Sequence, residues 1–132
     1  MKLPAMALLE YDSVAAGIRA ADAMVKRAPI SYFKAGTVHP GHYLVLIGGT
    51  VASVEEAWKT GVEEAPGFLI DEVFLPDVHE EVLRGAMGER RPLEDEALGV
   101  LETRCVASLL RAADAAVKGA AVRIAELRLA DD

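Results

Sequence analysis

The chain contains one stretch of sequence twice, and this internal repeat constrains its fold more than any other feature. A shift that carries Leu9 onto Leu101 also aligns Glu10 with Glu102 without a gap. The same shift places residues 19–23 on residues 111–115, and both blocks read Arg-Ala-Ala-Asp-Ala. A self-match of this kind indicates two copies of one supersecondary unit.

Each copy is expected to form a strand, a helix and a second strand. The short apolar run that ends at Glu10 is typical of a buried strand, and Asp12 or Ser13 can cap the helix that follows. Apolar residues recur at helical spacing in both predicted helices. They are Val14, Ile18, Ala21, Val25 and Ala28 in the first copy and Val106, Leu110, Ala113 and Val117 in the second.

The remainder of the first copy predicts further strands and helices in a regular order. We expect a strand over residues 30–35, a turn-rich loop over 36–41 and a buried strand over 42–47. Ser53 and Glu56 have the spacing of a capping box and predict a helix over 54–65. A strand over 68–75 and a short helix over 78–83 follow. Glycine, proline and charged residues then mark residues 85–96 as a linker.

This order defines an α+β fold. Residues 5–84 read β-α-β-β-α-β, which is the ferredoxin-like order, whereas the second copy reads only β-α-β. In that fold a third strand lies between the two strands of each unit, so the second copy lacks its central partner. We therefore expect a complete domain over residues 1–89, a linker over 90–96 and a partial second domain over 97–132. A circularly permuted domain over 42–132, with 1–41 left over, is the alternative.

Composition excludes several classes of partner. The 132 residues carry a net charge of −7 without a cluster of Lys and Arg, which argues against nucleic acid binding. The longest apolar run, around residues 43–47, is too short to cross a bilayer, so no membrane partner is expected. A single cysteine, Cys105, leaves no intrachain disulfide and fits a reducing cytoplasm.

Both copies resemble the shell-protein domain of bacterial microcompartments, the BMC domain. The resemblance is carried by Ala-Leu-Gly-Val-Leu-Glu-Thr at residues 97–103 and Ala-Ala-Asp-Ala-Ala-Val-Lys at 112–118. Pro40-Gly41, Gly48-Gly49 and Leu-Pro-Asp-Val-His at 75–79 add to it in the first copy. Two copies on one chain resemble the tandem class, which forms trimers that imitate a hexamer. Here the second copy is about half as long as the first.

The resemblance implies a structural protein without catalytic, cofactor or metal residues. Such proteins form trimeric or hexameric discs of sixfold or pseudo-sixfold symmetry, which tile with other shell proteins around enclosed enzymes in the bacterial cytoplasm. By position, the loop that lines the central pore for metabolites would be Ala35, Gly36, Thr37, Val38 and His39. Lys26 and Lys118 would lie at disc edges and contact the next disc. A further chain could complete the second domain.

Simpler interpretations of the same residues remain open. Lys26 and Lys118 near a helix C-terminus also favour the helix dipole. His39 and His42 near one turn give only a weak zinc signal, because no third ligand is evident. His79 among acidic residues is more typical of a solvated helix face than of acid–base chemistry. The alternative function is a ferredoxin-like oligomer that binds a small ligand or has a regulatory role.

Overall fold

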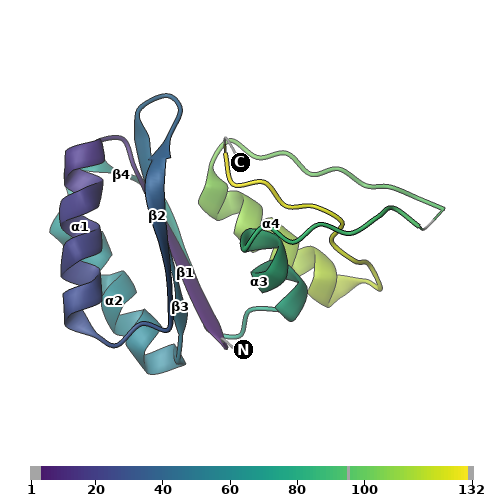
Figure 1. Ribbon diagram of the computed structural model, residues 1–132, viewed down its shortest axis with the longest axis horizontal. Coiled ribbons are helices and arrows are strands. Elements are labelled where there is room, and N and C mark those ends of the chain that lie inside the picture. Colours follow the sequence, from purple (N-terminus) through teal and green to yellow (C-terminus); the bar gives the residue numbers. More distant parts are fainter. Residues whose placement is uncertain (1–3, 95, 131–132) are drawn as a thin grey trace.

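The structure is a computed structural model that describes residues 4–94 and 96–130. Its centre is a four-stranded sheet with the strand order β2-β3-β1-β4. Helices cover both faces of this sheet, so the fold has three layers (Figure 1). The elements are β1 (Ala5–Tyr11), α1 (Val14–Arg27), β2 (Tyr32–Val38), β3 (His42–Gly49), α2 (Val51–Glu64), the 3-10 turn η1 (Pro66–Phe68), β4 (Leu69–Leu75), α3 (Glu80–Ala86) and α4 (Val106–Gly119).

The topology confirms the predicted ferredoxin-like α+β order of the first copy. Strand β3 pairs antiparallel with both β1 and β2, so it lies between the two strands of the first β-α-β unit. Strand β4 pairs with the other side of β1. All four strands therefore come from the first copy, and residues 5–75 build the whole sheet.

Strand β1 lies at the centre of the core. Every one of its seven residues is buried. Successive side chains of a strand point to opposite faces, and Leu8 packs in one helical layer whereas Leu9 packs in the other. Burial on both faces requires a continuous apolar run, which is why this segment shows no polar alternation in the sequence.

The layer formed by α1 and α2 packs tightly against the sheet and against itself. A Cβ on Gly61 of α2 would lie 2.6 Å from Met24 Sδ and 2.8 Å from Leu9 Cδ2, so any other residue here would have to displace these side chains. The hydroxyl of Tyr11 donates a hydrogen bond to the carbonyl of Gly61 at 2.7 Å. Burial and the nearby Glu64 carboxylate raise the pKa of Tyr11, which keeps this hydroxyl a donor at neutral pH.

The opposite face of the sheet is covered by α3 and by α4, the helix of the second copy. Helix α4 packs on β4, β1 and α3. The apolar cluster on this face consists of Met6, Leu8, Leu44, Leu46, Val73, Val78, Val82, Leu83, Ala86, Val106, Ala107, Leu110, Ala113, Val117, Leu127 and Leu129. The second copy thus completes the core of the first copy with its helix.

Helix starts follow their capping side chains. Ser13, one of the two predicted caps, accepts a hydrogen bond from the N–H of Ala16 and begins α1. The predicted start of α2 is wrong, because Thr50 accepts from the N–H of Ser53 and the helix begins before the expected capping box. Helix α3 also starts later than predicted, after the N-cap His79.

The flanking segments of the second copy differ from the prediction. Residues 97–102 and those after α4 were expected to be strands, yet they form none within the described part of the chain. They run as irregular segments beyond α3 and α4 (Figure 1), and Val100 is 81% exposed. A strand needs a neighbouring strand to satisfy its backbone groups, and within the described part of the chain these segments pair with none.

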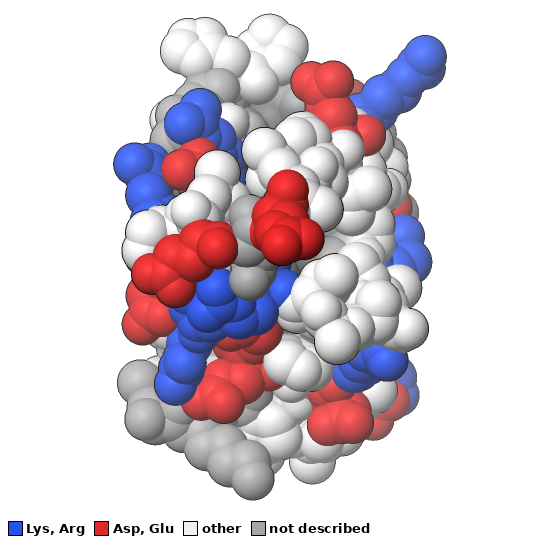
Figure 2. Space-filling model, turned by 90° about the vertical axis from the view of Figure 1, so that its right-hand side faces the viewer, with Lys and Arg blue, Asp and Glu red and all other residues white. Residues whose placement is uncertain are grey.

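The outer face over α3 and α4 carries charges of both signs. Figure 2 shows acidic and basic side chains intermingled on it, with neutral surface between them. Arg91 pairs with the largely buried Glu81 at 2.6 Å, and Arg84 pairs with Glu80 at 2.8 Å. In the described part of the chain, no helix has the length and apolar character needed to span a membrane.

Replacing Gly61 by alanine should lower the free energy of unfolding by about 1–3 kcal/mol, because the new methyl group overlaps Met24 and Leu9. Urea denaturation measures this change. Gly119→Ala is the matched control, since an added Cβ there meets nothing within 4 Å and should be neutral or stabilising. Equal effects of the two substitutions would contradict the close packing of α1 and α2.

Candidate functional site

The predicted pore segment forms one side of the β2–β3 hairpin. The prediction of a loop over residues 36–41 is wrong in its extent, because Gly36, Thr37 and Val38 continue β2 and pair with Leu44, Tyr43 and His42. Ala35 also lies in β2. Antiparallel pairing with β3 along its whole length holds these residues in the strand. Only residues 39–41 form the turn.

The hairpin ends in a tight turn at its tip. The peptide bond between His39 and Pro40 is cis, and Gly41 has a φ of +89°, which favours glycine. The N–H of Gly41 donates to the carbonyl of Val38 at 3.1 Å. Thr37 and His39 are exposed, whereas Ala35, Gly36 and Val38 are half-buried. The predicted pore segment, residues 35–39, therefore exposes one hydroxyl and one imidazole among half-buried residues.

The two lysines at matching positions of the repeat have different surroundings. Lys26, in the last turn of α1, has a side chain that is 73% exposed and pairs with Asp22 at 2.8 Å. Lys118, in the last turn of α4, pairs with Asp114 at 2.7 Å and donates to the carbonyl of Asp77 at 2.5 Å. Lys118 is thus fixed to the turn before α3, and Lys26 extends into solvent.

A buried carboxylate joins the two copies. Glu10 at the end of β1 is 6% exposed. One of its oxygens accepts from the N–H of Val106 at 3.2 Å, and the other lies 3.0 Å from Nδ1 of His42. The N–H of Val106 is unsatisfied within α4, whose N-cap Cys105 makes no side-chain capping bond. Glu10 therefore supplies the cap that the second copy's own sequence lacks.

Further side chains fix α4 on the first copy. Ser108 donates to a carboxylate oxygen of Asp71 at 3.1 Å, and Arg111 donates to the carbonyl of Glu72 at 3.0 Å. Desolvation raises the pKa of the nearby Cys105 thiol, and the carboxylates of Glu10 and Asp71 raise it further. The thiol is therefore protonated at neutral pH, when its nucleophilicity is low.

The histidines are separated by the fold. His42 contacts Glu10, and His79 accepts from the N–H of Glu81 as the N-cap of α3. His39 lies at the hairpin tip. Across the described residues, no group of three or more His, Cys, Asp or Glu side chains is arranged to hold a metal ion.

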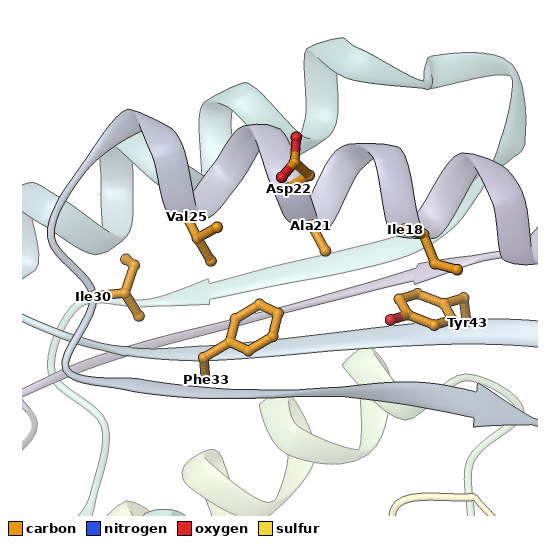
Figure 3. A pocket seen from close by; sticks show the side chains of 7 residues that line it. All are labelled: Ile18, Ala21, Asp22, Val25, Ile30, Phe33 and Tyr43. Carbon is orange, nitrogen blue, oxygen red and sulfur yellow. The ribbon is translucent and has the colours of Figure 1, made fainter.

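Sequence reasoning missed an apolar groove beside α1. It has a volume of about 470 Å³ and lies between α1 and the β2–β3 edge of the sheet (Figure 3). Its lining residues are Ile18, Ala21, Asp22, Val25, Ile30, Phe33 and Tyr43. The apolar stripe of α1 was evident in the sequence, but helical spacing does not show which part of a stripe the fold leaves uncovered.

Comparison with known proteins shows which protein family has this sequence and fold. The chain matches the BMC domain over residues 5–78 and 97–132. It is 36% identical over 126 residues to the bacterial microcompartment shell protein PduT of Citrobacter freundii, an alignment that spans 96% of this chain and 68% of that protein. The fold is also similar to the crystal structure of a microcompartment protein from Desulfitobacterium hafniense DCB. The TM-score is 0.75 at 35% identity, covering 98% of this chain and 72% of the other.

The repeated ferredoxin-like unit and its match to the BMC domain identify the chain as a structural protein of the microcompartment shell. The chain belongs to the BMC domain family. Its role is structural rather than catalytic, and it oligomerises and tiles with other shell proteins. This assignment favours shell formation over the alternative of a small-ligand-binding oligomer.

Removing the Glu10 carboxylate should release α4 from its position on the sheet. Glu10→Ala is expected to lower the free energy of unfolding by about 2 kcal/mol, because the buried N–H of Val106 and the ring of His42 lose their acceptor. Urea denaturation measures the change. Glu102→Ala, at the matching exposed position of the second copy, should change it by less than about 0.5 kcal/mol. Similar losses for both variants would contradict the capping role.

The raised pKa of Cys105 predicts slow alkylation. Because the thiolate is the reactive form, the rate of reaction with iodoacetamide should reach half its maximum at a higher pH than for N-acetylcysteine. Mass spectrometry of the intact chain follows the reaction, since Cys105 is the one cysteine of the sequence. A midpoint at or below that of N-acetylcysteine would show that burial and the surrounding carboxylates do not raise the pKa of the thiol.

Proposed function

We propose that the chain assembles into cyclic discs, as a trimer or a hexamer of sixfold or pseudo-sixfold symmetry, with the β2–β3 hairpins around a central pore for metabolites. The observation that carries this proposal is the hairpin itself, whose tip extends past the N-terminal end of α1 and stands clear of the helices (Figure 1). A tip that projects beyond the helices can meet its symmetry mates on an axis.

The hairpin has the chemistry that a pore lining needs. Ala35 and Gly36 are small, and an added Cβ on Gly36 would meet nothing within 4 Å, so neighbouring hairpins can approach closely on this side. The exposed side chains of Thr37 and His39 would then face the opening, and Val38 would pack behind them. Hydroxyl, imidazole and backbone groups offer hydrogen bonds to small polar metabolites.

Lys26 is the stronger of the two candidates for a contact between discs. Its ammonium group is exposed, and Asp22 holds it in place without burying it. Lys118 would have to leave the carbonyl of Asp77 and the carboxylate of Asp114 before it could reach another disc. Lys118 would act as an edge residue only after α4 had left α3.

The domain division remains part of the proposal. We assign a complete domain to residues 1–89, a linker to 90–96 and a partial second domain to 97–132. The uncovered apolar side chains Leu98, Val100 and Leu101 support the expectation that a further chain completes the second domain. Enzymes enclosed by the shell are further proposed partners.

Lys26→Ala should leave the discs intact and weaken their tiling. Loss of a contact worth about 1 kcal/mol raises the protein concentration needed for sheets at least about fivefold. Negative-stain electron microscopy across a concentration series measures this threshold, and native mass spectrometry checks the discs.

Lys59→Ala is the matched control, because Lys59 is an exposed lysine on α2 with no proposed edge role. If Lys26→Ala forms sheets at the wild-type concentration, the edge role of Lys26 is wrong. If it loses the discs themselves, Lys26 acts within a disc rather than between discs.

A further inference from the structure

The second copy diverges from the first at the positions that match the pore segment. The offset of the repeat carries residues 35–38 onto residues 127–130. The first stretch reads Ala-Gly-Thr-Val and the second reads Leu-Arg-Leu-Ala, without a single identity. Leu127 stands where the first copy has a small side chain, and Leu129 stands where it has a hydroxyl. The residues of the second copy are therefore suited to burial rather than to contact with a polar solute.

Both leucines are buried in the core. Leu127 is 9% exposed and Leu129 is 3% exposed, and both belong to the apolar cluster on the α3–α4 side of the sheet. Their neighbours Glu126 and Arg128 are exposed. This alternation is that of an extended segment with one face on the core. The segment after α4 thus covers part of the first copy's sheet although it pairs with none of its strands.

Polar contacts fix this segment to α3 and to the residues that follow α3. The N–H of Ile124 donates to the carboxylate of Glu81 at 3.0 Å. The N–H of Arg91 donates to the carbonyl of Ala125 at 2.8 Å, and the side chain of Arg91 pairs with Glu81 at 2.6 Å. Because these bonds involve particular atoms, they determine where the next residues of the segment lie.

The two leucines contact different parts of the first copy. Leu127 packs on α3, where a Cβ added to Gly85 would lie 3.0 Å from the Cβ of Leu127. Leu129 instead lines a cavity of about 100 Å³ behind the β2–β3 hairpin. The other walls of this cavity are residues 34–38 of β2 and the leucines of β1 and β3, namely Leu8, Leu44 and Leu46. Among the described residues that line the cavity, Leu129 alone comes from the second copy.

The cavity lies where Gly36 has no side chain. Side chains alternate along a strand, and Val38 of β2 packs against the α3–α4 cluster, so position 36 faces the same side. A Cβ added to Gly36 would meet nothing within 4 Å. The hairpin is therefore loosely packed within the predicted pore segment, and Leu129 forms the opposite wall.

This part of the hairpin has few other supports. Strand β2 lies at the edge of the sheet, with β3 as its one strand neighbour. The hairpin tip stands clear of the helices, and the segment after α4, yellow in Figure 1, returns toward the hairpin. A glycine inside an edge strand weakens it further. A region with few buried contacts opens at low cost in free energy, so its position depends on the contacts that remain.

We propose that Leu129 is a positioning residue that braces the β2–β3 hairpin from behind. The cavity is the space into which Gly36 and Val38 can move, and the leucine side chain is the wall that limits this movement. Its consequence for metabolite passage rests on the pore function proposed above, because the hairpin position would set the width of the opening. The brace itself is a property of a single chain.

The size of the side chain at position 129 should therefore control the mobility of the hairpin. Leu129→Ala enlarges the cavity, so that opening of β2 from β3 loses fewer packing contacts. Leu129→Phe extends into the cavity and adds contacts to the hairpin. The two substitutions should change hairpin mobility in opposite directions.

Hydrogen exchange of the full chain, followed at individual amides by NMR, measures this mobility. In Leu129→Ala the protected amides of residues 34–38 should exchange at least about tenfold faster relative to those of β1 in the same variant. In Leu129→Phe they should exchange more slowly relative to β1. The comparison with β1, the central strand, removes the change in global stability that any core substitution causes. An unchanged ratio in Leu129→Ala would overturn the proposal.

Leu127→Ala is the matched control, because it shortens a buried leucine of the same segment that does not line the cavity. It should accelerate exchange in the hairpin and in β1 by similar factors. If Leu127→Ala raises the ratio as much as Leu129→Ala does, the hairpin responds to the core as a whole and Leu129 is no brace.

A milder substitution decides the question if Leu129→Ala does not fold. Leu129→Val removes one methylene group and should raise the ratio of hairpin to β1 exchange about threefold. A folded Leu129→Val variant with the wild-type ratio contradicts the proposal.

Failure of the brace and failure of the proposed pore give different results. The exchange measurement uses dilute chain and needs no disc. A hairpin that loosens in Leu129→Ala, together with a wild-type chain that forms no discs in electron microscopy, leaves the brace intact and contradicts only the pore function. Discs with the hairpins around an opening, together with an exchange ratio that Leu129→Ala does not change, contradict only the brace.

Discussion

The four-stranded sheet has two apolar faces, and both must be removed from water. Strand β1 is buried over its whole length, so helices on one side alone would leave Met6 and Leu8 exposed. The first copy supplies α1 and α2 for one face but only the short α3 for the other. The remaining apolar surface is covered by α4. This requirement explains the position of the second copy, because its helix α4 covers the apolar surface of the sheet that α3 leaves open.

Polar contacts at the ends of α4 fix its direction and register. Glu10 caps the N-terminal end, and the turn at Asp77 and His79 holds the last two turns through Asp114 and Lys118. Apolar burial alone is not directional, whereas these bonds require particular atoms. A buried carboxylate left without partners would be costly, so Glu10 and α4 depend on one another.

The sequence predicted the elements that depend on local signals. The repeat, the cap at Ser13 and the helical stripes of α1 and α4 are local patterns, and both helices form as expected. The strand expected at residues 97–102 does not form, although its sequence resembles that of β1. A helix satisfies its backbone within one segment, whereas a strand needs neighbours distant in the sequence. The groove on α1 was missed for a related reason, since periodicity shows that a stripe is apolar but not which element covers it.

The position of α4 is the central claim, because the core and the cap at Glu10 both depend on it. A methyl NOE spectrum of the full chain, with selectively labelled leucine and valine, tests it directly. Cross-peaks from Leu110 and Val117 to Val78 and Val82 are predicted, since these residues share one apolar cluster. Cross-peaks from α4 to Val45 or Val54, which belong to the opposite cluster, or no cross-peaks at all, would contradict the account.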